Sequence, residues 1–273
     1  MVGAESPSGR RAPRAGASPP RVNKTTAGTA LKYPCERCPI RKLKVFRPFA
    51  PEELEFVKSF KTGELNVEPR ATILTEGTSS THLFTVLQGW AFRYKTLPDG
   101  RRQLLNFALP GDFLGLQASL FKEMSHSVEA LTPMLLCVFP RERLWELFEH
   151  YAGLAFDVTW LGSREEQILD QNLLSVGRRT ALERTAFLLL HLHERAKAVG
   201  LAPADSFSPP LTQQHLADAL GLSIVHTNKT LKRLSDRKII RWKNRELEIL
   251  DVKALREIAW WDDDDAGRVR PLI

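Results

Sequence analysis

The chain has 273 residues, of which 43% are hydrophobic, so it holds enough apolar side chains for two modest cores and their connecting segments. It contains no run of about 18 apolar residues and no N-terminal apolar stretch with a cleavage site, so we expect a cytoplasmic protein without a membrane span. The net charge of +7 indicates an acidic partner, and three cysteines do not describe a disulfide framework.

Residues 1–32 are rich in Arg, Pro, Ala, Gly and Ser and contain almost no large apolar side chain. Such a segment cannot bury enough surface to offset the entropy of ordering, so we expect a disordered basic tail. Residues 1–34 carry six basic residues and one acidic residue, which leaves a net charge of +2 for the rest of the chain. The tail either contacts nucleic acid or is a solvated extension without a role.

Residues 33–145 are expected to form a domain made of strands. Between Arg70 and Pro140, short apolar runs alternate with glycine-containing turns at a spacing of about ten residues. Asp99-Gly100 lies between two such runs and favours a hairpin, because glycine adopts a positive φ easily. The pattern is typical of a small all-β sandwich or barrel.

Residues 146–176 are expected to form one long helix. A stripe of apolar residues recurs there at intervals of three, four or seven residues, with the polar Glu165 and Asn172 in the same register. The stripe packs either on the chain's own β domain or on the same helix of a second chain, and we favour the homodimer. The residues expected at the dimer interface are Leu154, Val158, Leu161 and Ile168.

Residues 177–261 contain the most specific pattern of the chain. Thr212 is suited to cap a first helix, and Gly221 to end it in a left-handed conformation. Ser223 is suited to cap a second helix. One short helix, a glycine turn and a second capped helix form the motif that reads DNA. The residues expected on the buried side of the second helix are Ile224, Thr227, Leu231 and Leu234.

The other side of this second helix carries groups that suit the major groove. Asn can bond adenine through two hydrogen bonds, Lys can donate to guanine, and Val can contact a thymine methyl. Residues 229–245 hold eight basic residues against one acidic residue, a density suited to phosphates. Residues 239–250 are expected to form a hairpin, the wing. The residues expected to contact or orient DNA are Thr212, Ser223, Val225, His226, Asn228, Lys229, Lys232, Arg233, Arg237 and Lys243.

In this order of domains the sequence resembles the Crp/Fnr superfamily of transcription regulators, over residues 33–258. The resemblance implies an α+β fold: an N-terminal sensory β-roll of the cyclic-nucleotide-binding jelly-roll type, a long dimerisation helix and a C-terminal winged helix-turn-helix. It also implies a homodimer that binds a palindromic promoter site, activates transcription and contacts RNA polymerase. The motifs that carry it are Ile73–Gly77, Gly111–Gly115, Gly177–Ala181 and Leu211–Leu234.

Members of this superfamily that bind cyclic AMP hold its phosphate with an Arg-Ser or Arg-Thr pair in the β-roll. The corresponding stretch here, Ser125–Ala130, contains no arginine. A buried phosphate without a counter-charge is costly, so we do not expect this chain to bind cyclic AMP in that pose.

The oxygen-sensing branch of the superfamily holds an iron–sulfur cluster with four cysteines. Cys35 and Cys38 match the first two positions and Cys137 matches the fourth, whereas Lys44 stands at the third. A cluster normally needs four thiolates, so we expect neither a cluster nor a metal site. A cysteine-based redox or metal-sensing protein, with Cys35, Cys38 and Cys137 carrying the chemistry, stays open as the alternative function.

That branch reads DNA with a Glu, a Ser and an Arg where this chain has Val225, Asn228 and Lys229. Valine cannot accept the hydrogen bond that a glutamate accepts from cytosine, so we expect a different preferred half-site. The sequence has no phosphate-binding glycine loop, no His-Glu-x-x-His helix and no nucleophile elbow, and we expect no enzymatic activity. Residues 262–273 begin with four aspartates, and we expect an acidic, flexible tail.

Overall fold

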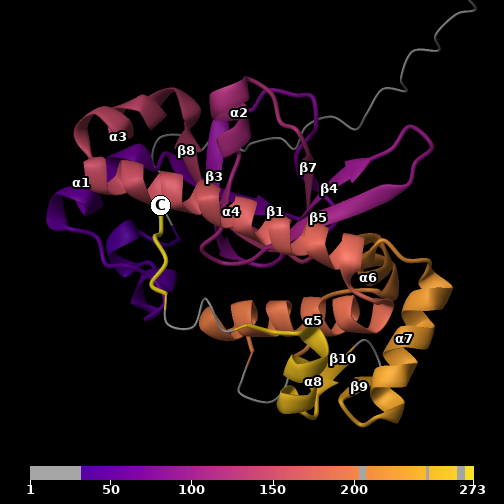
Figure 1. Ribbon diagram of the computed structural model, residues 1–273. Coiled ribbons are helices and arrows are strands. Elements are labelled where there is room, and N and C mark those ends of the chain that lie inside the picture. The colour runs from indigo at the N-terminus through magenta and orange to yellow at the C-terminus, as the bar shows by residue number, and fades with distance from the viewer. Residues whose placement is uncertain (1–31, 203–206, 244–245, 263–267) are drawn as a thin grey trace, which may run out of the picture.

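The computed structural model describes residues 32–202, 207–243, 246–262 and 268–273. The expected basic tail, apart from Lys32, lies outside the described residues. Figure 1 shows a strand-rich N-terminal unit, the long helix α4 running along it, and a helical C-terminal unit on the other side of α4. The expected α+β fold is confirmed. No helix in these ranges is long and apolar enough to cross a membrane.

The N-terminal unit is a β-roll of two four-stranded sheets. The hairpin expected at Asp99-Gly100 joins β4 to β5, with Leu97 N donating to Arg101 O at 2.8 Å. One sheet has the order β1, β8, β3, β6, and these strands span Gly63–Val67, Met134–Pro140, His82–Gln88 and Phe113–Leu114. The other has the order β2, β7, β4, β5, and these strands span Thr72–Leu74, Ser127–Ala130, Ala91–Thr96 and Arg102–Ala108.

Short helices cover one end of this roll. Pro51 is the first residue of α1. Proline fits there because the N–H groups of the first turn have no acceptor within the helix, so its missing N–H breaks no hydrogen bond. Phe60 of α1 is fully buried and its ring lies 5.0 Å from that of Phe139 on β8, so α1 closes the core of the sheets. The helical elements here are η1 (Cys35–Arg37), η2 (Ile40–Lys42), α1 (Pro51–Phe60), α2 (Leu116–Phe121), η3 (Arg141–Arg143) and α3 (Leu144–His150).

The long helix α4 spans Ala152–Arg178, whereas the sequence predicted a helix from residue 146. The chain breaks at Tyr151, whose φ of −130° is not helical, so the first residues of the predicted helix belong to α3. Gly177 lies inside the last turn of α4, and the chain leaves the helix at Arg179, whose ψ of 142° is extended. Thr180 then caps α5, Ala181–Ala198, by accepting a hydrogen bond from Glu183 N.

The apolar stripe of α4 is buried within the chain's own fold, which corrects the dimer interface expected from the sequence. The polar members of the same stripe also bond to the β-roll: Glu165 pairs with Arg93 at 2.6 Å, and Asn172 donates to the carbonyl of Leu105 at 2.7 Å. The four apolar side chains therefore have almost no surface left for a second chain. Exposed fractions are 0% for Leu154, 2% for Val158, 7% for Leu161 and 5% for Ile168.

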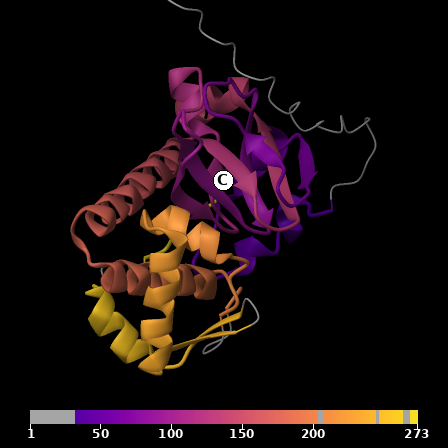
Figure 2. The same ribbon diagram turned by 90° about the vertical axis from the view of Figure 1, so that its right-hand side faces the viewer.

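The C-terminal unit is a helix-turn-helix followed by a two-stranded wing. Figure 2, turned by 90°, shows α7 on the side facing the viewer, in front of α5. Wing and helices share a core in which Leu216, Leu234 and Leu255 are fully buried. Besides α5, its elements are α6 (Gln213–Leu220), α7 (Ile224–Asp236), β9 (Ile240–Lys243), β10 (Glu246–Ile249) and α8 (Val252–Ala259).

The last six residues return to the β-roll, where we expected a flexible tail. Arg270 forms a parallel bridge with Phe46, and Thr85 Oγ1 donates to the carbonyl of Ile273. Leu272 and Ile273 are each only 4% exposed, so apolar burial holds the segment in place. The acidic run lies outside the described residues except for Asp262.

Candidate nucleic-acid interface

The turn between α6 and α7 has the caps that the sequence predicts. Thr212 Oγ1 accepts a hydrogen bond from His215 N at 3.2 Å, and Ser223 Oγ accepts one from His226 N at 3.2 Å. Gly221 has φ 63°, a left-handed conformation that is strained for residues with a Cβ. These three residues fix where one helix ends and the next begins.

The inner side of α7 packs on the C-terminal core. Thr227 and Thr230 are buried, and their hydroxyls donate to the carbonyls of Ser223 and His226, so no polar group is left unpaired. Leu231 and Leu234 are buried as expected. Ile224, which we also expected in the core, is 42% exposed because it opens the helix at the rim of the unit.

The outer side of α7 is exposed over its whole length. Val225 has 60% of its surface exposed, although its side chain is apolar and exposure to water does not stabilise it. Within the described residues, none of the cations on this side pairs with a carboxylate, so all keep their charge available for a polyanion. The exposed residues of this reading face are Val225, His226, Asn228, Lys229, Lys232 and Arg233.

The cationic surface continues beyond the end of α7. Arg237, Lys238 and Lys243 are exposed, and Lys238 has φ 57°, the left-handed conformation that turns the chain from α7 into the wing. Arg241 on β9 pairs instead with Glu248 on β10, across the wing. The positions suited to phosphate therefore flank the reading face, and Arg241 serves mainly the wing itself.

The helix-turn-helix is also docked on the β-roll, a contact that the sequence did not predict. Arg102 on β5 donates to Asp218 on α6 at 2.7 Å, and Gln103 donates to the carbonyl of Ala219 at 3.0 Å. The Phe92 and His215 rings lie 5.4 Å apart, and burial lowers the pKa of His215. The β4–β5 hairpin thus holds α6 directly, which leaves α7 facing outward.

The three cysteines lie in the core at the base of the β-roll, all buried and with free thiols. The ammonium group of Lys61 lies beside Cys35 and Cys137 and donates to Glu64 Oε1 at 2.7 Å. Burial raises the pKa of Cys137 to about 12, against the opposing effect of Lys61, so it stays a thiol at neutral pH.

These residues do not fit an iron–sulfur cluster. Only three thiols are present, and a buried lysine cation occupies their neighbourhood, while Lys44 is exposed elsewhere. In the described ranges, no group of three or more His, Cys, Asp or Glu is arranged to hold a metal ion. We assign no chemistry to Cys35, Cys38 or Cys137.

The stretch that would face a cyclic nucleotide also lacks a free cation. Ser127 Oγ accepts from Glu76 N, and burial lowers the pKa of His126 to about 3, so its imidazole is neutral. Arg93, on the neighbouring strand, pairs with Glu165 of α4. The expectation that cyclic AMP does not bind there stays a prediction, and this arrangement supports it.

Two family models match the chain. The model of the cyclic nucleotide-binding domain matches residues 64–151, which cover most of the β-roll. The model of the Crp-like helix-turn-helix domain matches residues 183–258, which include α6, α7 and the wing.

Characterised relatives match over most of their length. The nitrogen fixation regulation protein FixK of Bradyrhizobium diazoefficiens is 31% identical over 82% of this chain and 93% of its own. The transcriptional activatory protein AadR of Rhodopseudomonas palustris is 28% identical over 85% of this chain and 95% of its own. The solved structure of FixK2 from Bradyrhizobium japonicum has a TM-score of 0.66 and 26% identity, and covers 71% of this chain and 96% of that one. The chain therefore belongs to the Crp/Fnr family and is a DNA-binding transcription regulator.

Proposed function

We propose that this regulator is a cytoplasmic homodimer that activates promoters by binding an inverted-repeat site, with one α7 in each half-site. The observation that carries the proposal is the reading face of α7, which is exposed along its whole length and unpaired within the described residues. A helix of this kind enters the major groove, where its first turns meet base edges. Asn228 and Lys229 are the side chains suited to read bases, and Arg237 and Lys243 to hold phosphates.

A second face of α4 supports dimerisation. Leu169, Leu173 and Val176 are 40%, 73% and 40% exposed, although they are apolar. A helix with such a row gains stability from a partner helix in heptad register. The row, called here the outer stripe, consists of Thr159, Gly162, Glu166, Leu169, Leu173 and Val176, at intervals of three and four residues.

Activation and contact with RNA polymerase are proposed from the relatives, since FnrL of Cereibacter sphaeroides and AadR are both named as transcriptional activators. Polymerase contact requires a surface that stays free when DNA is bound. The β-roll offers one, because α7 lies on the far side of α4 from α1 and α3 (Figure 1).

Selection of bound duplexes from random DNA tests the proposal. We expect an inverted repeat with half-sites about one helical turn apart, bound by two chains, and a half-site different from that of the oxygen-sensing branch. At fixed salt, the selected duplex should bind about 1,000-fold more tightly or better than a shuffled duplex of the same composition. Equal affinity for the selected and shuffled duplexes would contradict the proposal.

A further inference from the structure

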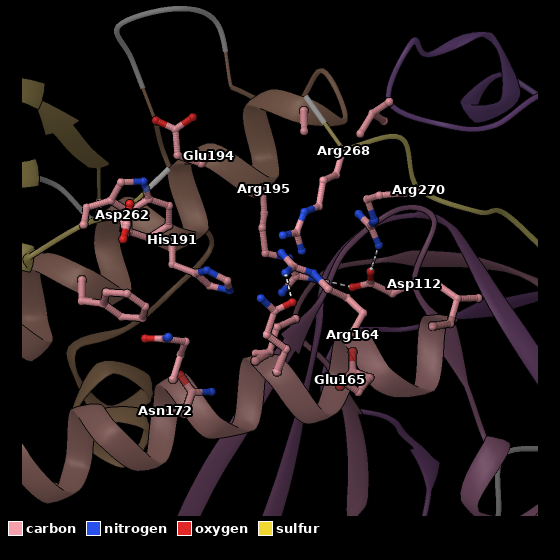
Figure 3. Close-up of a pocket in the computed structure, with 18 of the residues that line it drawn as sticks. Asp112, Arg164, Glu165, Asn172, His191, Glu194, Arg195, Asp262, Arg268 and Arg270 are labelled. Atoms are coloured by element: carbon pink, nitrogen blue, oxygen red, sulfur yellow. Dashed lines mark hydrogen bonds and ion pairs between the residues drawn. The ribbon is translucent and has the colours of Figure 1, made fainter. Parts of the chain in front are cut away.

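A large cavity lies between the two units, outside the β-roll and away from the reading face. Its volume is about 780 Å³, within the range of small-molecule sites. The long helix α4 forms one wall, α5 forms the opposite wall, and the C-terminal segment with Arg268 and Arg270 closes one end (Figure 3). Residues of both the β-roll and the DNA-binding unit therefore meet around this space.

One end of the cavity is rich in guanidinium groups. Figure 3 shows Arg164, Arg195, Arg268 and Arg270 together at the end of the cavity that also holds Asp112. Arg270 lies 2.7 Å from Asp112, and Arg195 pairs with the other oxygen of the same carboxylate. Among the described residues, seven Lys and Arg side chains line the cavity against four Asp and Glu, and this excess of positive charge favours an anionic ligand. Arginine forks suit planar carboxylates and phosphates.

The other end is aromatic. The ring of Phe187 stacks on that of His191 with centroids 6.0 Å apart, and it lies 5.3 Å from the ring of Trp261. The guanidinium of Arg179 lies 4.0 Å above Phe187. Burial lowers the pKa of His191 to about 3, so the imidazole there is neutral. A planar ring is the ligand group that such an end accepts.

Two buried nitrogens on the cavity lining have no hydrogen-bond partner among the described residues: Nε2 of His191 and Nε of Arg270. A buried polar atom without a partner costs free energy, and a ligand that offers a partner recovers it. The two atoms belong to the two ends of the cavity, so each end has one polar atom that a ligand can satisfy.

We propose that this cavity binds a small aromatic anion, with its planar ring at the Phe187, His191 and Trp261 end and its phosphate or carboxylate at the arginine end. The walls of the cavity come from both units. A bound ligand that fits one arrangement of the two units better than another therefore stabilises that arrangement. This binding does not depend on the proposed reading of DNA, and the test uses no DNA.

Titration calorimetry on the full chain tests the proposal with four probes. Two combine a ring and an anion, 5′-AMP with a phosphate and 1-naphthoate with a carboxylate. Two carry one half each, inorganic phosphate and adenosine. We expect at least one combined probe to bind with a Kd below about 1 mM and about tenfold more tightly than either half. Which combined probe binds better distinguishes a phosphate from a carboxylate ligand.

Variants place the bound probe in the cavity. Arg164→Gln changes the arginine end and Phe187→Leu changes the aromatic end, and each should weaken binding about fivefold or more. Arg178→Gln, an exposed arginine on the same helix but outside the lining, should bind as the unaltered chain does. Circular dichroism verifies that each variant is folded. Failure of both combined probes to bind below about 1 mM, or full affinity in either cavity variant, overturns the proposal.

Discussion

Arg102 on β5 donates a hydrogen bond to Asp218 on α6 at 2.7 Å, across the boundary between the β-roll and the helix-turn-helix. The side chains are 27% and 13% exposed, so the pair is partly shielded from solvent. The Arg102 guanidinium also lies 5.1 Å above the ring of Phe92. This contact fixes the orientation of α6, and through the turn at Gly221 it fixes that of α7.

Arg102→Ala should loosen α6 without unfolding the β-roll. A partly buried ion pair contributes about 1 kcal/mol, so amide hydrogens of α6 should exchange about fivefold faster, as measured by mass spectrometry. Arg101→Ala is the matched control, because Arg101 is exposed and, among the described residues, its ion pair is with Asp99 in its own turn. Equal exchange of α6 in both variants would show that Arg102 does not hold the helix.

Lys229→Ala and Arg237→Ala should weaken DNA binding in different ways. Loss of a base contact at Lys229 should cost about 1–3 kcal/mol on the selected duplex and relax selectivity at one base position. Loss of a phosphate contact at Arg237 should weaken selected and shuffled duplexes alike and reduce the salt dependence. Fluorescence anisotropy on both duplexes separates the two roles, with Lys122→Ala on the β-roll as control. An equal loss on both duplexes for Lys229→Ala would contradict its assigned role.

The helix-turn-helix could be predicted from the sequence because its signals are local. A left-handed glycine and two capping side chains act within four residues of the position they define, so Thr212, Gly221 and Ser223 identify the motif without knowledge of the rest of the fold. The docking of α6 could not be predicted in this way, because Arg102 and Asp218 are 116 residues apart.

The two apolar faces of α4 show a different limit. Heptad spacing predicts that a stripe needs a partner, but it does not say whether the partner is the same chain or another. Leu161 meets the chain's own core, whereas Leu173, twelve residues later, stays exposed. The choice depends on which side of the helix faces the rest of the chain, because Asn172 bonds to the β-roll while the next residue, Leu173, points away from it.

Leu173→Asp should convert the dimer to monomers, measured by sedimentation velocity, because it places a charge in the outer stripe of both chains. Leu161→Asp should instead destabilise the single chain by about 3 kcal/mol or more, because Leu161 is buried. Leu201→Asp, an exposed leucine outside α4, should leave the dimer intact. Dimers that persist in Leu173→Asp would place the interface on another surface.

Cys137 should resist alkylation in the native protein. Its thiol is buried and its pKa of about 12 keeps the reactive thiolate rare at pH 8, so iodoacetamide should label it only after unfolding in urea. Mass spectrometry of the labelled peptide gives the extent of reaction. Anaerobically purified protein should likewise show no visible charge-transfer bands. Rapid labelling of the folded chain, or bands that disappear in air, would restore a chemical role for the cysteines.

The C-terminal segment could not be predicted from sequence, because six residues show no periodicity and their anchor, Asp112, lies 158 residues before Arg270. Burial opposes ionisation of Asp112, but Arg195 and Arg270 outweigh it and lower its pKa to about 2. Against an ordinary value of 3.8, this shift corresponds to about 2 kcal/mol of stabilisation at neutral pH.

Because the pKa of Asp112 is lower in the folded chain, its carboxylate contributes the whole of this stabilisation above about pH 3.8. The contribution is lost as the pH falls toward 2 and the carboxylate becomes protonated. Asp112→Asn should therefore lower the melting temperature at pH 6 and differ progressively less from the unaltered chain as the pH drops below about 4. The amide of Arg270, which donates to Val45 O at 2.7 Å, should also exchange faster. Asp170→Asn, at an exposed site on α4, should show neither effect. A melting difference that is independent of pH would mean that packing, and not this carboxylate, holds the segment.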